Sequence, residues 1–467
     1  MNNINVEVEL EPGFQNYRLL PAPPSPEEAA EAVRRSWQCL LLAPREVTAP
    51  LLAAAYAAPL AEIVVPDFII WLWGGTGSYK STLAGLILSL FGDFSETNLP
   101  LSFESTSNAL ERSLFLAKDI LAVVDDWRPG VTRADSAEMD SKAQRLLRGV
   151  GNRQGRGRMT RDTMLRASYP PRGVVAVTAE ALPEGPAFQS AAARSLSINL
   201  SKSDVDLAKL SELQRDKQML RVAMTGYVSY VAGSYERLAK ELPVQREELR
   251  DLLRDKLHGS HPRTSDNAAA LIVALRQLTE YSMSVGAMAE AEAKKWYKMA
   301  RNGVLTAAKA HTEATRGGDP ASTFLGFMSS LFAAKRAYVK NREYGKIPPW
   351  QCLQIGWEDM AAAWEDPNAT DPVERFHAAS KAEFVGWADE SFLYLDKEAA
   401  YAAVSGFAQR GGLPFGIKPK ALWEAMSRSG KSLVDPGRND TTAKIEGKTR
   451  RIIQIPRELV VDEDEAS

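Results

Sequence analysis

The hydrophobic periodicity changes along the chain, and these changes are the first guide to its organisation. Between residues 41 and 200, short continuous apolar runs are separated by segments of helical character. The runs at 68–73, 119–126 and 173–180 are typical of strands that are covered on both faces in a parallel sheet. We therefore expect residues 41–200 to form an α/β core in which a parallel sheet lies between two layers of helices.

The regions outside this core have other patterns. Residues 1–40 read as an extended arm followed by a helix that starts after Ser25, a suitable N-cap. Alanine- and charge-rich helical patterns fill residues 201–345 and predict an all-α domain. Residues 346–460 contain a hairpin, two helices and a second hairpin, a pattern that predicts a winged-helix domain, and residues 461–467 form an acidic tail.

The loop after the first predicted strand resembles the phosphate-binding pattern G-x-x-x-x-G-K-S/T. Gly74 supplies the first glycine, Lys80 the lysine and Ser81 the hydroxyl, whereas Tyr79 replaces the second glycine. In such loops the backbone N–H groups surround the β-phosphate, the lysine meets the β- and γ-phosphates and the hydroxyl binds Mg²⁺. The predicted ATP-binding residues are Gly74, Gly75, Thr76, Gly77, Ser78, Tyr79, Lys80, Ser81 and Thr82.

Tyr79 is the irregular position in this loop. We expect it to adopt an ordinary backbone conformation with its ring pointing outward, because the neighbouring glycines keep the rest of the loop permissive. The alternative is that the stretch is only a Gly/Ser turn ahead of an apolar helix.

Polar residues at the ends of the next two predicted strands favour the phosphate-loop interpretation. Asp125 and Asp126 end the second strand, about 45 residues after Lys80. Asp125 is predicted to hold Mg²⁺ together with Ser81, and Asp126 to polarise the attacking water. Thr178 ends the third strand, where ring ATPases place a residue that senses the γ-phosphate, and Glu180 lies close by. Each feature alone is also consistent with a purely structural role.

Composition limits the remaining choices. The chain has 467 residues, 45% of them apolar and 25% charged, with a formal net charge of −2. Global charge therefore gives no sign of nucleic-acid binding, and any such surface has to be local. Cys39 and Cys352 lie far apart and form no metal-binding pattern. With no signal-peptide pattern and no apolar run long enough to cross a bilayer, we expect a cytoplasmic protein without a membrane partner.

One local basic segment stands out between the second and third predicted strands. Residues 144–173 hold eight arginines and one acidic residue, Asp162, and several glycines. A flexible arginine-rich loop is suited to phosphate contacts, so Arg153, Arg156 and Arg158 are predicted to bind DNA in the pore of a ring. The alternatives are a solvated basic loop, or arginines that pair with the acidic residues of a neighbouring subunit.

Further cations are candidates for partner contacts. Arg194 precedes an apolar segment after the third strand, where ring ATPases often place an arginine that reaches the γ-phosphate of the next subunit. Lys418, Lys420 and Arg450 lie on the second helix and the wing of the predicted winged helix, which would contact DNA or dock a protein. A surface arginine without such a role is the alternative for Arg194.

The runs "FESTSNALERSLFLAKDILAVVDDW", "LLLAPREVTAPLLAAAYAAPL" and "VVAVTAE" resemble the "domain of unknown function 927" family of phage, plasmid and integrative-element replication proteins. The resemblance covers roughly residues 37–200. It implies a P-loop ATPase core similar to AAA+ and superfamily-3 hexameric helicases, with Lys80, Asp125, Asp126, Thr178 and Arg194 as catalytic residues. Tyr79 and Asp126 depart from the glycine and glutamate that are usual at their positions.

Together these observations predict an ATP- and Mg²⁺-dependent DNA helicase or translocase that forms a homo-oligomeric ring, expected to be a hexamer. It would act on single-stranded or forked DNA during replication of a mobile element, with a separate primase or polymerase as partner. A nucleotide-regulated initiator or loader that binds DNA without unwinding it is the second hypothesis. An inactive ATPase that serves as a scaffold is the third.

Overall fold

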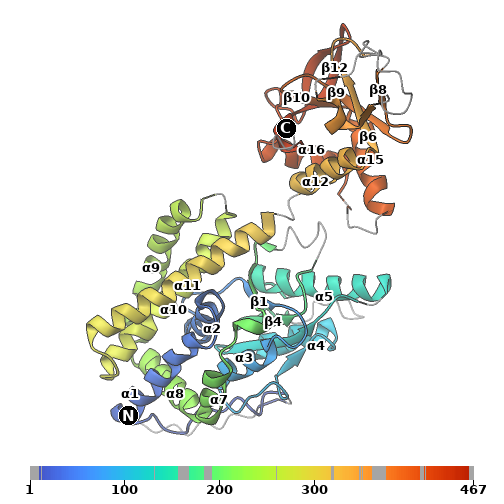
Figure 1. Ribbon diagram of the computed structural model, residues 1–467. Helices are drawn as coiled ribbons and strands as arrows, with labels where there is room; N and C mark the ends of the chain where they lie inside the picture. The colour runs from blue at the N-terminus through green and yellow to red at the C-terminus, as the bar shows by residue number, and fades with distance from the viewer. Residues whose placement is uncertain are drawn as a thin grey trace, which may run out of the picture. The chain divides into compact units, whose positions relative to one another are not determined.

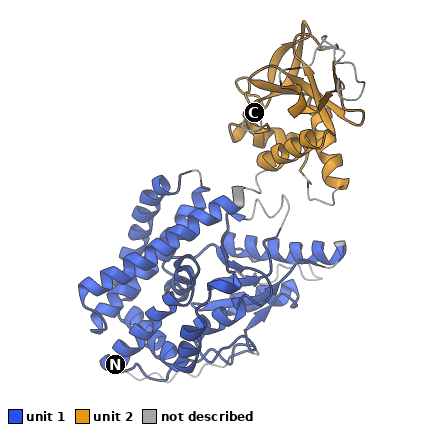
Figure 2. Ribbon diagram, viewed as in Figure 1, with its two compact units in different colours: residues 1–183, 190–314 blue, residues 184–189, 315–467 orange. Residues whose placement is uncertain are grey.

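The structure of the chain is a computed structural model. The chain divides into two units, which Figure 2 shows in different colours. Unit 1 comprises residues 1–183 and 190–314, and unit 2 comprises residues 184–189 and 315–467. The residues that the structure describes are 10–11, 13–130, 132–155, 168–183, 192–258, 260–316, 320–345, 349, 351–359, 375–410, 415 and 417–461.

A five-stranded parallel sheet organises unit 1. Its strands are β1 (Ile69–Trp73), β2 (Leu101–Ser102), β3 (Leu121–Trp127), β4 (Val174–Ala179) and β5 (Ser195–Asn199). Their order is β2-β3-β4-β1-β5, and every neighbouring pair is parallel. All five carboxyl ends therefore meet at one edge of the sheet, and β4 lies between β1 and β3.

Helices cover both faces of this sheet, as the continuous apolar runs predict. On one face lie α2 (Arg45–Ala57) and α3 (Lys80–Leu88), and on the other lie α4 (Ser107–Leu116) and α5 (Arg133–Asn152) (Figure 1). The ring of Trp71 on β1 makes edge-on contacts with the rings of Phe103 and Trp127. The predicted α/β core with helices on both faces is thus confirmed.

The helices of the predicted all-α region pack onto this core instead of forming a compact unit of their own. They are α7 (Leu207–Arg215), α8 (Lys217–Gly233), α9 (Tyr235–Lys256), α10 (Pro262–Ser284) and α11 (Glu290–Arg316). The N-terminal α1 (Pro26–Trp37) packs on α8, and α10 packs on α2. Every residue of α2 from Val47 to Ala57 is buried, so this helix needs cover on the side that the sheet does not reach. The α10 helix supplies that cover, and one continuous hydrophobic core results.

Helix α11 is tied to β5 by a buried histidine. Nδ1 of His311 accepts a hydrogen bond from the backbone N–H of Ser197 (3.1 Å) and lies 2.7 Å from the Ser197 hydroxyl oxygen. Burial lowers the pKa of His311 to about 4. The imidazole is therefore neutral near pH 7, which leaves Nδ1 free to accept this bond.

Unit 2 is built on a second, mixed five-stranded sheet. The helices and strands of unit 2 are α12 (Pro320–Ala333), β6 (Ala337–Asn341), β7 (Trp357–Asp359), β8 (Phe376–Ala378), β9 (Glu383–Ala388), β10 (Phe392–Leu395), α15 (Lys397–Arg410), α16 (Pro419–Arg428), β11 (Thr441–Ile445) and β12 (Lys448–Pro456). The sheet order is β11-β12-β10-β9-β6, with β6 parallel to β9 and the other pairs antiparallel. Strands β7 and β8 form a separate two-stranded sheet.

The two faces of the larger sheet of unit 2 differ in their cover. One face packs with α12, α15 and α16 in an aliphatic core. The other carries an aromatic cluster that contains Trp387, Tyr394 and Ile452, with Phe384 and Phe392 packed against it. Because α12 and β6 belong to this unit, the boundary lies before α12 and not at the expected residue 345.

Most of the predicted acidic tail lies outside the described residues. No helix in the described part of the chain has the length and apolar character needed to cross a membrane.

Candidate active site

The Gly-rich loop begins at the carboxyl end of β1, where three strands hold its first residue. The N–H of Gly74 donates to the carbonyl of Ala179 at the end of β4 (3.1 Å), and the N–H of Leu200, just after β5, donates to the carbonyl of Trp73 (2.8 Å). A Cβ atom at position 74 would lie 2.0 Å from the Leu200 carbonyl oxygen. Glycine is required at position 74 because the backbone of Leu200 approaches so closely.

Tyr79 adopts the left-handed backbone conformation, with φ 65° and ψ 19°. The expectation of an ordinary conformation is therefore wrong: Tyr79 keeps the backbone shape that the usual glycine adopts most easily. This costs an L-residue about 1–2 kcal/mol. The half-buried ring packs against the main hydrophobic core, and this burial offsets part of the cost.

Lys80 starts α3 and turns back over the loop. Its Nζ donates to the carbonyl oxygens of Gly74 (2.7 Å) and Gly75 (2.9 Å) and to the hydroxyl of Ser78 (3.2 Å). Desolvation lowers the pKa of Lys80, while the carboxylates of Glu180, Asp125 and Asp126 act in the opposite direction. None of the three acceptors carries a full negative charge, so an anion such as a phosphate could replace them.

The end of β3 brings the predicted metal-binding residues together. Ser81 Oγ donates to Oδ1 of Asp125 (2.8 Å), and the Thr178 hydroxyl donates to the same oxygen. The N–H of Asp126 donates to Thr178 Oγ1 (3.1 Å). The β3–β4 register shifts between Val124 and Trp127, and Asp126 has a positive φ of 63°. Thr178 thus holds both residues of the acidic pair, and its only proton is used on Asp125.

Glu180 is a member of the site that the sequence analysis named without assigning it a role. It follows β4 directly, and its N–H donates to the Trp127 carbonyl (2.9 Å). Its Oε1 accepts a hydrogen bond from the Thr76 hydroxyl in the Gly-rich loop (2.9 Å). Glu180 is half-buried, whereas Asp126 is exposed. Its position at the carboxyl edge of the sheet, two residues after Thr178, is the sequence signal that could have identified it.

The arrangement can bind a phosphate-bearing ligand with a hard cation. Lys80 provides positive charge, and the loop presents backbone N–H groups at the start of α3. The Ser81 hydroxyl and the Asp125 carboxylate are hard oxygen donors of the kind that Mg²⁺ prefers. Thr82 lies in the first turn of α3 beside them.

Arg194 lies at the other edge of the sheet. It immediately precedes β5, whose first residue pairs with the start of β1. Its Nε donates to Oδ1 of Asn152 (3.1 Å), and its side-chain carbons lie against Gly151. Desolvation lowers the pKa of Arg194, and the positive charges of the nearby Arg263 and Arg148 lower it further. A basic cluster therefore occupies the amino edge, away from the loop of the same chain.

Arg153 was predicted to grip DNA, but the structure gives it another role. It ends α5 in the left-handed conformation, and its guanidinium donates to the carbonyls of Pro171 (2.6 Å) and Pro66. Burial lowers its pKa to about 10. A guanidinium used in this way holds the chain around α5 together, and the DNA contact of Arg153 stays a prediction. Arg156 and Arg158 lie outside the described residues.

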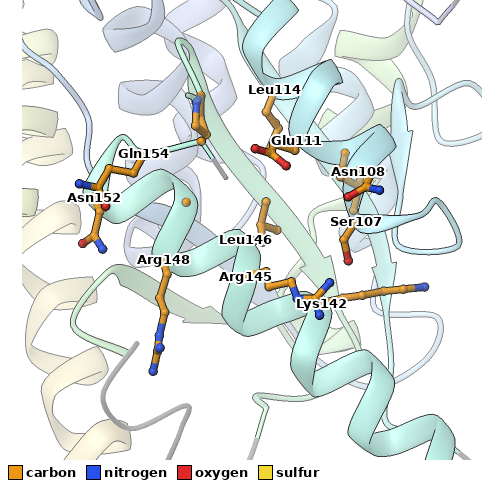
Figure 3. A pocket seen from close by; sticks show the side chains of 14 residues that line it. Ser107, Asn108, Glu111, Leu114, Lys142, Arg145, Leu146, Arg148, Asn152 and Gln154 are labelled. Carbon is orange, nitrogen blue, oxygen red and sulfur yellow. The ribbon is translucent and has the colours of Figure 1, made fainter. Parts of the chain in front are cut away.

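Two other arginines of the basic segment lie on α5 and not in a flexible loop. A cavity of about 460 Å³ between α4 and α5 is bordered by Arg145 and Arg148, and leucines such as Leu114 and Leu146 line it. Figure 3 shows Leu146 pointing toward α4 and Arg148 pointing away from it. The helix therefore presents these neighbours in different directions.

The predicted cations of unit 2 divide between two faces. Lys418 is the N-cap residue of α16 and Lys420 lies in its first turn, and both are exposed. Arg450 lies with its guanidinium 4.9 Å from the ring centroid of Trp387, on the aromatic face of the sheet. Arg450 thus stands apart from the two lysines with which it was grouped.

Comparisons with known proteins agree with the resemblance found in the sequence. Residues 41–169 match the family described as "Domain of unknown function (DUF927)". This part of the chain is similar to that family. The matched segment contains the Gly-rich loop and the acidic pair, but it ends before Thr178, Glu180 and Arg194.

The whole chain is also similar in fold to a solved structure titled "SCCmec type IV Cch - active helicase". The TM-score is 0.52 at 13% sequence identity, and the match covers 94% of this chain and 71% of that one. At this identity the likeness extends to the fold. Among curated proteins no significant match is found. The segment that matches the family model is thus part of a longer fold that this chain shares with the solved structure.

Proposed function

We propose that the protein is an ATPase that forms a ring and moves along or unwinds DNA during replication of a phage, plasmid or integrative element. The convergence of Lys80, Ser81, Asp125 and Thr178 at one edge of a parallel sheet carries this proposal. A chance Gly/Ser turn gives no reason for a lysine, a hydroxyl and a carboxylate from separate elements to meet there. The helicase title of the similar structure supports the same direction.

The loop from Gly74 to Thr82 would bind the phosphates of ATP as a P-loop. Lys80 would exchange the carbonyls of Gly74 and Gly75 for phosphate oxygens. Ser81 and Asp125 would hold Mg²⁺, which offsets the negative charge of the phosphates when bound. The Ser81–Asp125 hydrogen bond already places both oxygens together.

Two carboxylates compete for the role of activating the attacking water. Asp126 is the residue expected from its sequence position, but it is exposed and lies in a bulge. Glu180 is bonded to Thr76 and is the carboxylate that most strongly influences Lys80. We favour Glu180 as the proton acceptor, with Thr178 positioning the acidic pair and not sensing phosphate directly.

We propose a ring because Arg194 lies at the opposite edge of the sheet from the Gly-rich loop of its own chain. An arginine at the amino edge cannot serve the phosphates bound at the carboxyl edge of the same sheet, whereas a neighbouring copy can bring the two edges together. Arg194 would then stabilise transition-state charge in trans. Stacking of such copies in a closed ring, expected to be a hexamer, would leave a pore for single-stranded DNA near the segment that contains Arg156 and Arg158.

We propose that unit 2 is a winged helix with added strands. Strands β6 to β9 separate α12 from β10 along the chain, and α15, α16 and the β11–β12 hairpin follow β10, with β12 between β10 and β11 in the sheet. Strands β9 and β6 extend this sheet. We propose that unit 2 binds duplex DNA and that a separate primase or polymerase continues the reaction.

The test combines nucleotide turnover with strand displacement. Lys80→Ala is expected to abolish ATP turnover and displacement of a labelled strand from a forked substrate, because the phosphates lose the half-buried cation of the loop. Lys240→Ala, which removes an exposed lysine from α9, is the matched control and should keep both activities. Equal turnover in wild type and Lys80→Ala would disprove the ATPase assignment.

A nucleotide-regulated initiator or loader is the second candidate. The closed loop favours it, because Lys80 bonds its own loop and Thr76 bonds Glu180, so nucleotide must break these contacts to enter. A protein of this class would assemble on DNA with ATP but leave the forked substrate intact, and that outcome would replace the helicase proposal.

A further inference from the structure

Unit 2 contains a basic hollow that brings together residues from three separate elements. Lys420 from the first turn of α16, Arg451 from β12 and Arg438 from the turn before β11 line a cavity of about 380 Å³. Lys397, Trp423, Asn439 and Asp440 complete its described lining. Lys420, Arg438 and Arg451 are all exposed.

The charges of this hollow are unbalanced. Asp440 is the one carboxylate among its described lining residues, and it forms an ion pair with Lys397. The other acidic residue of the turn, Asp435, accepts hydrogen bonds from the hydroxyls of Thr441 (2.8 Å) and Thr442 (3.2 Å). Lys420, Arg438 and Arg451 therefore remain as a cluster of like charges, which repel one another unless an anion lies between them.

The strand geometry decides which wing arginine belongs to this cluster. Arg450 pairs in register with Ala443, a member of the aromatic cluster, and its guanidinium lies over Trp387. Arg451 is the next residue, so its side chain leaves the opposite face of β12, where α16 lies. The face that carries Lys420 therefore carries Arg451 and not Arg450.

We propose that this hollow binds a backbone phosphate of duplex DNA. This deepens the proposed DNA-binding role of unit 2 and rests on it. Guanidinium and ammonium groups on three sides suit a phosphodiester, and the Asn439 amide can donate a further hydrogen bond. Single-strand sites use exposed aromatic faces on which bases stack, whereas Trp423, the aromatic residue of this lining, is buried.

The adjacent arginines provide a matched pair of variants for the test. Binding of a fluorescently labelled duplex of random sequence to the full chain is measured by anisotropy at several salt concentrations, without nucleotide. Arg451→Ala and Lys420→Ala are each expected to weaken binding several-fold and to reduce the salt slope by about 1. Arg450→Ala removes the same charge from the other face and should leave affinity and slope as in wild type.

Several results would overturn the proposal. They are an equal loss in Arg450→Ala and Arg451→Ala, no loss in Arg451→Ala, or tighter binding of a single strand of the same length. The absence of salt-sensitive duplex binding by the wild type would point to an acidic protein partner instead. Arg451→Lys keeps the charge and should retain most of the slope, which separates loss of the contact from loss of the fold. Lys80→Ala should still bind duplex, so failure of the ATPase proposal is distinguishable from failure of this one.

Discussion

The two edges of the sheet in unit 1 carry opposite chemistry. At the carboxyl edge, the carboxylates of Asp125, Asp126 and Glu180 raise the pKa of Lys80, which desolvation lowers, and hydroxyl groups of Ser81 and Thr76 bond to Asp125 and Glu180. At the amino edge, Arg194 lies near Arg148 and Arg263. One edge is therefore equipped to hold phosphate and metal, and the other to supply positive charge. In the proposed ring, each site would combine one edge from each of two copies.

The strongest test of this comparison removes the arginine from the amino edge. Arg194→Ala is expected to lower ATP turnover by about 10³-fold, because transition-state charge loses its partner. Mixing Arg194→Ala chains with Lys80→Ala chains should restore part of the activity, since each variant supplies the edge that the other lacks. Turnover by the mixture that equals the mean of the two separate variants would place the arginine outside the site.

A second test distinguishes the acids within the carboxyl edge. Glu180→Gln is expected to lower turnover by about 10²-fold while nucleotide affinity is kept, because a general base is lost. Asp126→Asn should have a smaller effect. Thr76→Ala removes the hydrogen bond between Thr76 and Glu180 but keeps the carboxylate, so a loss equal to that of Glu180→Gln would assign Glu180 a holding role only. A larger loss in Asp126→Asn than in Glu180→Gln would reverse the assignment.

The smallest expected effect concerns the backbone of the loop itself. Tyr79→Gly and Tyr79→Ala both remove the ring, but only glycine also relieves the left-handed conformation. We expect the glycine variant to be the more stable of the two by about 1 kcal/mol in the free energy of unfolding. Chemical denaturation of both variants measures the difference. An alanine variant as stable as the glycine variant would mean that the loop changes shape when the ring is lost.

The sequence predicted the carboxyl edge far better than the amino edge or the basic segment. Lys80, Asp125 and Thr178 could be placed together because parallel strands end at the same edge, so chain order and strand type are sufficient. Arg153 could not be placed, because its partners are backbone carbonyls of Pro66 and Pro171, which no residue pattern reveals.

The same reasoning explains the other differences. Alternation along β12 implies that Arg450 and Arg451 leave opposite faces, but only the packing decides which face meets α16. The helical layer reads as a separate domain because its strand signals vanish, and only the full burial of α2 shows that it covers the core. The conformation of Tyr79 differs from the expectation because the neighbouring glycines do not remove the need for a left-handed residue directly before Lys80.

Strand β5 joins the two edges in a mechanical sense. Arg194 immediately precedes the strand and Leu200 immediately follows it. Leu200 lies so close to Gly74 that no Cβ atom would fit between them. The extended chain from Arg194 to Leu200 spans about 20 Å and resists compression along its axis. A displacement of the Gly-rich loop on binding or release of phosphates would therefore shift β5 along its axis and move Arg194 at the other end. In the proposed ring, the position of Arg194, which would serve the site of the next copy, would then depend on the nucleotide bound in its own copy. Hydrolysis would therefore occur at the sites one after another around the ring.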